Sequence, residues 1–141
     1  MRELLADRDI AAAFPLMRQL RDRLLEETFL AEVRRQQAEG YRLFGLFELD
    51  RLCALAGVRR THTLSRGKHL FVDDLVTAED PRGQGHGGSL LRWLAGCARE
   101  QGIPRVYLDS RLTARGFYAK LGFQFLTSIP CWSDAGDLER G

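Results

Sequence analysis

The stretch Asp74–Leu91, DLVTAEDPRGQGHGGSLL, decides the fold, because it joins a predicted strand to a predicted helix through a glycine-rich loop. Gly83, Gly85 and Gly88 form the pattern G-x-G-x-x-G, and a second pattern, R-x-x-G-x-G, begins at Arg82. In both patterns small residues let backbone N–H groups converge on an oxyanion at the positive end of the following helix. The stretch therefore predicts a phosphate or pyrophosphate site, unless the glycines only make a connecting turn.

The G-x-G-x-x-G pattern alone would indicate a dinucleotide-binding loop. The preceding strand, the following helix and Asp109 at the end of the next strand all imitate such a unit. Two features argue against it. The residues AEDPR, which include Pro81 and Arg82, separate the glycines from their strand. The remaining chain is also too short for a six-stranded doubly wound sheet with a substrate region, so we do not expect NAD as the ligand.

Length and composition indicate one globular domain, residues 1–141, with 45% hydrophobic and 28% charged residues. A net charge of only +2 predicts no strong sequence-independent binding to nucleic acid or to an anionic membrane. The charged start MRELLADRD lacks the apolar segment of a signal peptide, and no apolar run reaches membrane-spanning length. We therefore expect neither nucleic acid nor a membrane as a partner.

The cysteines and histidines are too scattered in the sequence to predict a disulfide framework or a metal site. The cysteines are odd in number and contain no C-x-x-C pair: Cys53, Cys97 and Cys131. We expect reduced thiols and a cytoplasmic location. The histidines form no metal-binding set, so no metal is expected: His62, His69 and His86.

Hydrophobic periodicity predicts helices first, then antiparallel strands, then strand, helix, strand, helix and strand. Pro15 is expected to kink the first helix or delay its start, and Asp7 or Asp9 is a candidate N-cap. In chain order we expect a strand at 2–6, helices at 7–20 and about 26–39, strands at 41–48, 52–59 and 69–77, a helix from about 86, a strand at 105–110, a helix at 113–122, a last strand at 123–128 and a loop to 141. This order predicts an α/β domain with a mixed sheet (α+β mixed).

Two motifs in this order, separated by one helix and one strand, carry a family resemblance. The first is the R-x-x-G-x-G loop, and the second is A-x-x-F-Y-x-K-x-G-F, formed by Ala114, Phe117, Tyr118, Lys120, Gly122 and Phe123. Together they closely resemble the GNAT superfamily of acyl-CoA-dependent N-acyltransferases, over residues 69–125. One departure is Arg111, which stands where many members carry Asn.

The resemblance implies a GNAT-like single domain, with antiparallel N-terminal strands, splayed central parallel strands and flanking helices. It also implies acetyl-CoA (coenzyme A) as co-substrate, bound where the strands FVDDLVT and RVYLDS separate. Unpaired backbone groups of Leu75, Val76 and Thr77 would pair with the pantetheine amides. The glycine loop would hold the pyrophosphate through Arg82, Gly83, Gln84, Gly85, His86, Gly87, Gly88 and Ser89. Further cofactor contacts are expected from Ser110, Ala114, Phe117, Tyr118 and Lys120.

The implied reaction is direct attack of an amine on the acetyl carbonyl. Tyr118 matches the family tyrosine that commonly protonates the departing thiolate; otherwise it is a packing residue beside Phe117. Asp73 and Asp74 are candidates for a base or an amine-binding carboxylate, and a β-bulge would decide which of them faces the substrate. The alternatives are that the carboxylates pair with arginines, and that an ordered water accepts the proton.

The resemblance thus predicts an N-acetyltransferase that acts on a primary amine of a small molecule or of a protein amino group. The adjacent Asp73 and Asp74 mildly favour a cationic acceptor. The alternative function is a catalytically inactive acyl-CoA-binding sensor or interaction module. The family resemblance and the weakly periodic tail leave a homodimer open.

Overall fold

The computed structural model of the chain describes residues 1–79 and 85–141, and these form two compact units, Met1–Asp109 and Ser110–Gly141. Each unit is described by itself. Within the described residues, no helix is both long and apolar enough to cross a lipid bilayer.

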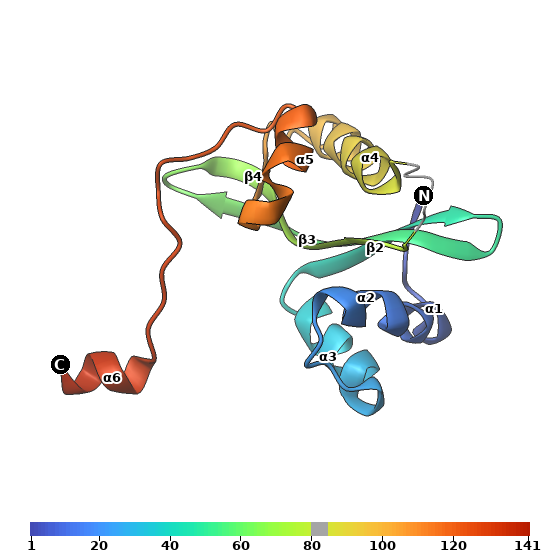
Figure 1. The fold of residues 1–141 in the computed structure, drawn as a ribbon, viewed down its shortest axis with the longest axis horizontal. Coiled ribbons are helices and arrows are strands. Elements are labelled where there is room, and N and C mark those ends of the chain that lie inside the picture. The colour runs from blue at the N-terminus through green and yellow to red at the C-terminus, as the bar shows by residue number, and fades with distance from the viewer. Residues whose placement is uncertain (80–84) are drawn as a thin grey trace. The chain divides into compact units, whose positions relative to one another are not determined.

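The first unit contains a five-stranded sheet whose strands follow one another in chain order, β1-β2-β3-β4-β5 (Figure 1). Neighbouring strands are antiparallel from β1 to β4, and β4 and β5 are parallel. The mixed sheet predicted from the sequence is therefore confirmed. The strands are β1 (Arg2–Glu3), β2 (Tyr41–Glu48), β3 (Arg51–Thr63), β4 (Gly67–Thr77) and β5 (Val106–Leu108).

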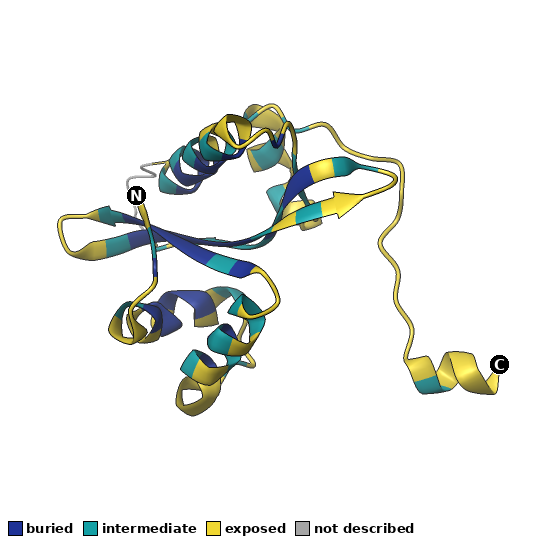
Figure 2. Cartoon of the chain, turned by 180° about the vertical axis from the view of Figure 1, so that it is seen from behind, coloured by how far each residue is buried: buried dark blue, intermediate teal, exposed yellow. Residues whose placement is uncertain are grey.

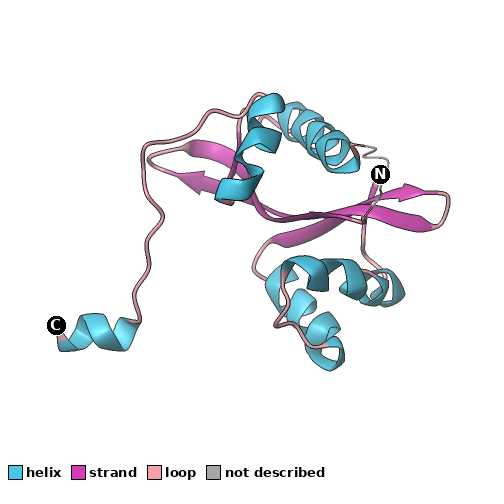
Figure 3. Cartoon of the chain, in the orientation of Figure 1, coloured by secondary structure: helices cyan, strands magenta, loops and turns pink. Residues whose placement is uncertain are grey.

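Three helices cover one face of this sheet, and α4 covers the other (Figure 3). On the first face lie α1 (Asp7–Ala12), α2 (Phe14–Leu20) and α3 (Glu26–Gln37); on the second lies α4 (His86–Glu100). The break between α1 and α2 falls at Ala13, and Pro15 stands in the first turn of α2, where its missing N–H costs nothing. The interruption expected at Pro15 is thus confirmed.

The predicted N-cap of the first helix is wrong by one position. Ala6 is the N-cap and makes no side-chain hydrogen bond, while Asp7 and Asp9 lie inside the first turn. A carboxylate there still interacts favourably with the positive end of the helix. The acidic residues therefore located the first turn of the helix correctly, although neither of them is the N-cap. Asp9 also accepts a hydrogen bond from Arg2, which lowers its pKa.

The main hydrophobic core lies between the sheet and α1–α3, and a second layer lies beneath α4 (Figure 2). In the main core, the rings of Phe14 and Phe29 meet edge to face with their centroids 5.3 Å apart. α4 buries one apolar stripe against the other sheet face, formed by Leu90, Leu91, Leu94 and Ala98. The spacing of this stripe is the one that the sequence predicted.

Two β-bulges interrupt the sheet, and each turns a reactive side chain. In β3, Leu46 pairs with Ala54 and Phe47 with Leu52, so Cys53 is the extra residue. In β4, Gly57 pairs with Asp74 and Val58 with Val72, so Asp73 is the extra residue. A bulge of this kind changes the direction of the residue it contains relative to simple alternation.

The second unit contains a short 3₁₀ helix, η1 (Leu112–Ala114), and the helices α5 (Arg115–Lys120) and α6 (Ala135–Arg140). The helix predicted at 113–122 is confirmed. The strand predicted at 123–128 and the loop predicted for the tail are wrong: the described residues 123–128 form no strand, and residues 135–140 are helical. Phe125 and Leu126 are exposed, and an apolar run becomes a strand only where another strand pairs with it.

Candidate functional site

The carboxyl half of β4 forms a free sheet edge in the first unit. β5 pairs with β4 only at Leu70, Phe71 and Val72, whereas β4 continues to Thr77. Over residues 74–77, no described strand pairs with this edge, although β3 pairs along the other edge. The predicted separation of the two parallel strands is therefore present, and it leaves backbone N–H and C=O groups available to an extended ligand.

The start of α4 provides an anion-binding end in the same unit. Gly85 adopts a left-handed conformation (φ 71°), which glycine reaches without a steric penalty, and α4 begins at the next residue, His86. The backbone N–H of Ser89 donates to Gly85 O at 3.0 Å, and within the described residues no backbone acceptor is found for the N–H groups of His86, Gly87 and Gly88. Gly87 and Gly88 are buried. Three predicted pyrophosphate contacts, Arg82, Gly83 and Gln84, lie outside the described residues.

Asp74 is held by two donors from other elements. Arg21, just beyond α2, donates from Nε to Oδ1 of Asp74 at 2.8 Å, and its Nη2 donates to the backbone oxygen of Asp73 at 2.8 Å. The hydroxyl of Tyr41 donates to Oδ2 of Asp74 at 2.8 Å. Both carboxylate oxygens of Asp74 therefore have a hydrogen-bond donor, one of them charged.

Tyr41 reaches Asp74 by crossing the sheet above Gly57. A Cβ at Gly57 would lie 1.8 Å from the hydroxyl oxygen of Tyr41, so only glycine fits beneath the ring. Burial raises the pKa of Tyr41 far above its usual value, and the negative charge of Asp74 raises it further. Tyr41 thus stays protonated and acts as a permanent hydrogen-bond donor to the carboxylate.

Asp73 is paired with Arg59 of β3. Nε of Arg59 donates to Oδ2 of Asp73 at 2.6 Å, and Nη2 donates to Oε1 of Gln36 in α3 at 3.0 Å. The hydrogen bond to Asp73 raises the pKa of Arg59 above its usual value. The guanidinium also lies 5.3 Å from the ring centroid of Tyr41, so the two aspartates belong to one polar cluster.

Each aspartate faces an arginine, which is the alternative considered from the sequence. Arg21 and Arg59 balance the charges of Asp73 and Asp74, so the pair no longer favours a cationic acceptor. The sequence did not identify Arg21 or Arg59 as site residues. They lie 53 and 14 positions from their partners, and no local pattern signals such distant pairings.

The remaining predicted site residues lie in the second unit. Tyr118 in α5 is partly buried and contacts Phe117 and Phe123 edge to face, at centroid distances of 5.0 and 5.4 Å. Burial raises the pKa of Tyr118 above its usual value of 10.0, so its hydroxyl is protonated near neutral pH. Ser110 donates its hydroxyl to Arg111 O at 2.8 Å, while Phe117 and Lys120 are exposed and Ala114 ends η1.

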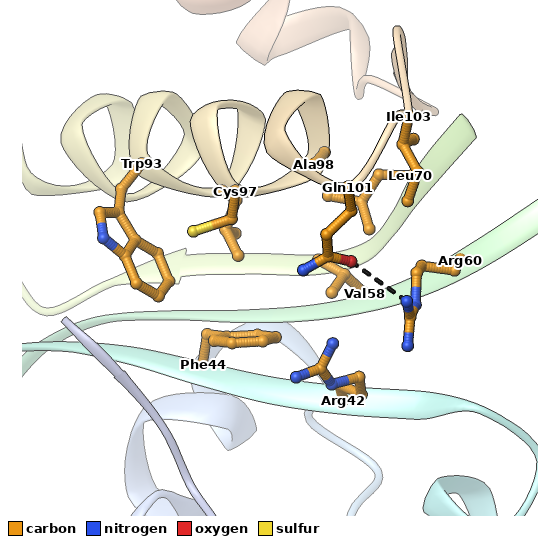
Figure 4. A pocket seen from close by; sticks show the side chains of 11 residues that line it. Arg42, Phe44, Val58, Arg60, Leu70, Trp93, Cys97, Ala98, Gln101 and Ile103 are labelled. Carbon is orange, nitrogen blue, oxygen red and sulfur yellow. Dashed lines mark hydrogen bonds between the residues drawn. The ribbon is translucent and has the colours of Figure 1, made fainter. Parts of the chain in front are cut away.

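A hollow of about 180 Å³ lies beneath α4 in the first unit (Figure 4). Trp93 and Cys97 point from the helix toward Phe44 and Arg42 of β2, and Arg60 donates to Gln101 at 3.1 Å. The guanidinium of Arg42 is bound through two nitrogens to the carboxylate of Glu3, each at 2.9 Å. This hollow contains none of the predicted site residues and is smaller than typical ligand pockets, which occupy roughly 300–1,000 Å³.

Comparisons with known proteins agree with this fold. Residues 8–123 match the family model described as the Acetyltransferase (GNAT) family. The uncharacterized N-acetyltransferase YhdJ of Bacillus subtilis (strain 168) is 36% identical over 128 residues, which cover 87% of this chain and 90% of YhdJ. The chain therefore belongs to the GNAT family of acetyltransferases.

Solved structures share the fold. An acetyltransferase of Trypanosoma brucei superposes with a TM-score of 0.73 at 24% identity, over 94% of this chain and 96% of that one. A predicted acetyltransferase of Clostridium acetobutylicum, solved with acetyl-CoA, superposes with a TM-score of 0.71 at 20% identity, over 98% of this chain and 96% of that one. At these identities the likeness concerns the fold.

Proposed function

We propose that the protein is an N-acetyltransferase that transfers the acetyl group of acetyl-CoA to a primary amine. The observation that carries the proposal is the free edge of β4 over Asp74–Thr77, together with the glycine-initiated start of α4 in the same unit. Membership of the GNAT family and the acetyl-CoA of the Clostridium acetobutylicum structure support this choice of donor. A cytoplasmic location, expected from the cysteine pattern, belongs to the same proposal.

The two features of the first unit suit the two halves of coenzyme A. Backbone groups of Leu75 and Thr77 face the free edge and would pair with the pantetheine amides as an added strand does, while those of Val76 face β3. The N–H groups from Gly85 to Gly88, at the positive end of a 15-residue helix, would bind the pyrophosphate. The side chain of Ser89 would add a hydroxyl donor to this set.

The chemistry requires an attacking amine, a donor to the oxyanion and a proton for the thiolate. The amine nitrogen forms a bond to the acetyl carbon, and the carbon–sulfur bond breaks. The backbone N–H of Leu75, next to Val76, faces the free edge and would donate to the oxyanion that develops between these events. Tyr118 would give its proton to the thiolate, and its raised pKa keeps that proton available near neutral pH.

Asp73 and Asp74 would take different parts in handling the amine. Donors engage both oxygens of Asp74, so we assign Asp74 to ordering the site. Among the described contacts, Arg59 engages only Oδ2 of Asp73, and the bulge turns this residue. We assign Asp73 to binding the amine or accepting its proton, directly or through a water.

Turnover and binding, measured separately, test the proposal. Release of coenzyme A thiol is followed with a panel of amines that includes a polyamine, an aminoglycoside, an amino sugar and a lysine peptide. Tyr118→Phe should lower kcat by about 10²–10⁴-fold and leave acetyl-CoA affinity unchanged, because only the proton donor is lost. Tyr107→Phe, which changes another tyrosine in the same way, is the matched control and should retain turnover.

Unchanged turnover in Tyr118→Phe would remove Tyr118 as the acid. If the unaltered protein bound acetyl-CoA and turned over none of the amines, the result would favour an acyl-CoA-binding module without catalysis.

A further inference from the structure

Three side chains of different chemistry meet beside the start of α4. They are Glu48, the last residue of β2, Cys53, the bulged residue of β3, and His86, the first residue of α4. Their carboxylate oxygen, thiol sulfur and imidazole nitrogen all lie within 4.8 Å of one another. Nε2 of His86 and Oε1 of Glu48 are 3.6 Å apart.

The local structure explains why these residues meet although the sequence separates them. Side chains alternate along a strand, and the bulge at Cys53 breaks that alternation in β3. Cys53 is buried, and the His86 side chain is only 13% exposed, whereas Glu48 is 59% exposed. The cluster therefore has a fixed inner end at the sulfur and an outer end that faces solvent.

We propose that Glu48, Cys53 and His86 form a binding site for a zinc ion. A thiolate, an imidazole and a carboxylate are the three ligand types that Zn²⁺ uses, and three protein ligands commonly leave a fourth position for water. Tetrahedral bonds of roughly 2.0–2.3 Å place the ligand atoms about 3.3–3.6 Å apart. The pair His86–Glu48 already meets this spacing, and the exposed Glu48 can rotate to complete the set.

Among the residues that the structure describes, the three groups make only weak contacts with one another and with their neighbours. The thiol of Cys53 donates to Arg51 O at 3.5 Å, and His86 and Glu48 make a 3.6 Å ion pair if the imidazole is protonated. Zinc would replace these contacts with three bonds, after loss of the thiol proton. The sequence predicted no metal site because its cysteines and its histidines are each scattered along the chain, whereas this cluster takes one ligand from each of three residue types.

A zinc ion in this position would connect the end of the β2–β3 hairpin to the first residue of α4. His86 directly follows Gly85, so the metal would hold the beginning of the helix that we propose binds the pyrophosphate. The site is distinct from the transfer chemistry, and zinc binding can be measured without acetyl-CoA. Failure of one proposal therefore leaves the other intact.

Titration of the purified, metal-stripped protein with Zn²⁺ tests the site, with Co²⁺ as a spectroscopic probe. We expect one equivalent of Zn²⁺ to bind and to raise Tm, and Co²⁺ to give a thiolate-to-metal charge-transfer absorption. Cys53→Ser should abolish that absorption and weaken binding by more than about 100-fold, since even an outer partner of a metal ligand contributes roughly 10–100-fold. His86→Gln and Glu48→Gln should each weaken zinc binding.

Cys97→Ser and His62→Gln are the matched controls, because neither residue belongs to the cluster, and both should retain binding. Absence of saturable Zn²⁺ binding to the unaltered protein would overturn the proposal. Binding that survives Cys53→Ser, or that is lost in Cys97→Ser instead, would also overturn it, because the metal would then lie elsewhere.

Discussion

Tyr41 of β2 reaches across β3 to Asp74 of β4 and donates one hydrogen bond to it. Its ring is buried above Gly57, and its hydroxyl donates to Asp74, whose side chain is 14% exposed. Tyr41→Phe keeps the ring and removes the donor. We expect the free energy of unfolding to fall by about 1.5–3 kcal/mol, as for other hydrogen bonds to charged groups, measured by urea denaturation at pH 7. An unchanged urea midpoint would show that the hydrogen bond contributes nothing to stability.

The raised pKa of Tyr41 also predicts how stability depends on pH. In the unfolded chain the phenol ionises near its usual value of 10.0, while in the folded chain it stays protonated to higher pH. The stability due to this difference is complete below pH 10 and is lost as the pH rises toward the folded pKa. Above pH 10, this residue should make the free energy of unfolding fall by about 1.4 kcal/mol per pH unit.

Urea titrations between pH 9 and 11 measure how the free energy of unfolding changes with pH. Above pH 10, Tyr41→Phe should reduce this slope by about 1.4 kcal/mol per pH unit, which is the contribution of one proton. Equal slopes in the two proteins would contradict the assignment of the alkaline loss of stability to Tyr41.

At the scale of elements, alanine substitutions at two glycines should change the free energy of unfolding in opposite directions. Gly57 in β3 lies beneath the Tyr41 ring, and a Cβ there would overlap it, so Gly57→Ala should destabilise the protein by about 1–3 kcal/mol. Gly96 is exposed in the interior of α4, and a Cβ there meets nothing within 4 Å. Gly96→Ala should stabilise by about 0.5–1 kcal/mol.

The two unfolding free energies, measured side by side, check this contrast. Destabilisation by both substitutions would mean that α4 does not expose Gly96, and two neutral results would mean that the Tyr41 ring can move aside.

The sequence predicts those elements whose signals are local. Alternating apolar residues locate β2 within its observed bounds, the break between α1 and α2 follows from Pro15, and Gly85 and His86 mark the start of α4. The predicted strand at 123–128 is wrong because pairing with another strand, which sequence does not show, decides whether an apolar run joins a sheet. The helix at Ala135–Arg140 is missed because six residues give too short a periodic pattern.

The same distinction applies to the candidate site. The glycine loop and the Asp73–Asp74 pair are visible as short motifs, and the expected bulge is found at Asp73. The arginines that pair with the aspartates, and the meeting of Cys53 with His86, depend on register and on packing between distant elements. Such contacts follow from the folded structure, and no spacing in the sequence encodes them.

At the scale of the whole molecule, the tail bears on the oligomeric state. Three large apolar side chains between residues 129 and 138 are strongly exposed: Ile129, Trp132 and Leu138. Exposed apolar residues of this kind often mark an interaction surface. We therefore predict that the tail lies in the interface of the homodimer that the sequence left open. Sedimentation equilibrium should then show a dimer for the full chain and weaker association for a chain truncated after Ser128. Identical association of the two chains would exclude the tail from the interface.

The central claim, that the protein uses acetyl-CoA, is tested most directly by calorimetric titration of the full chain with acetyl-CoA, with NAD as the parallel ligand. We predict saturable binding of one acetyl-CoA per chain and no heat from NAD, because the free edge of β4 suits pantetheine and the start of α4 suits a pyrophosphate. Binding of NAD without binding of acetyl-CoA would contradict the account, and would mean that the glycines serve a dinucleotide.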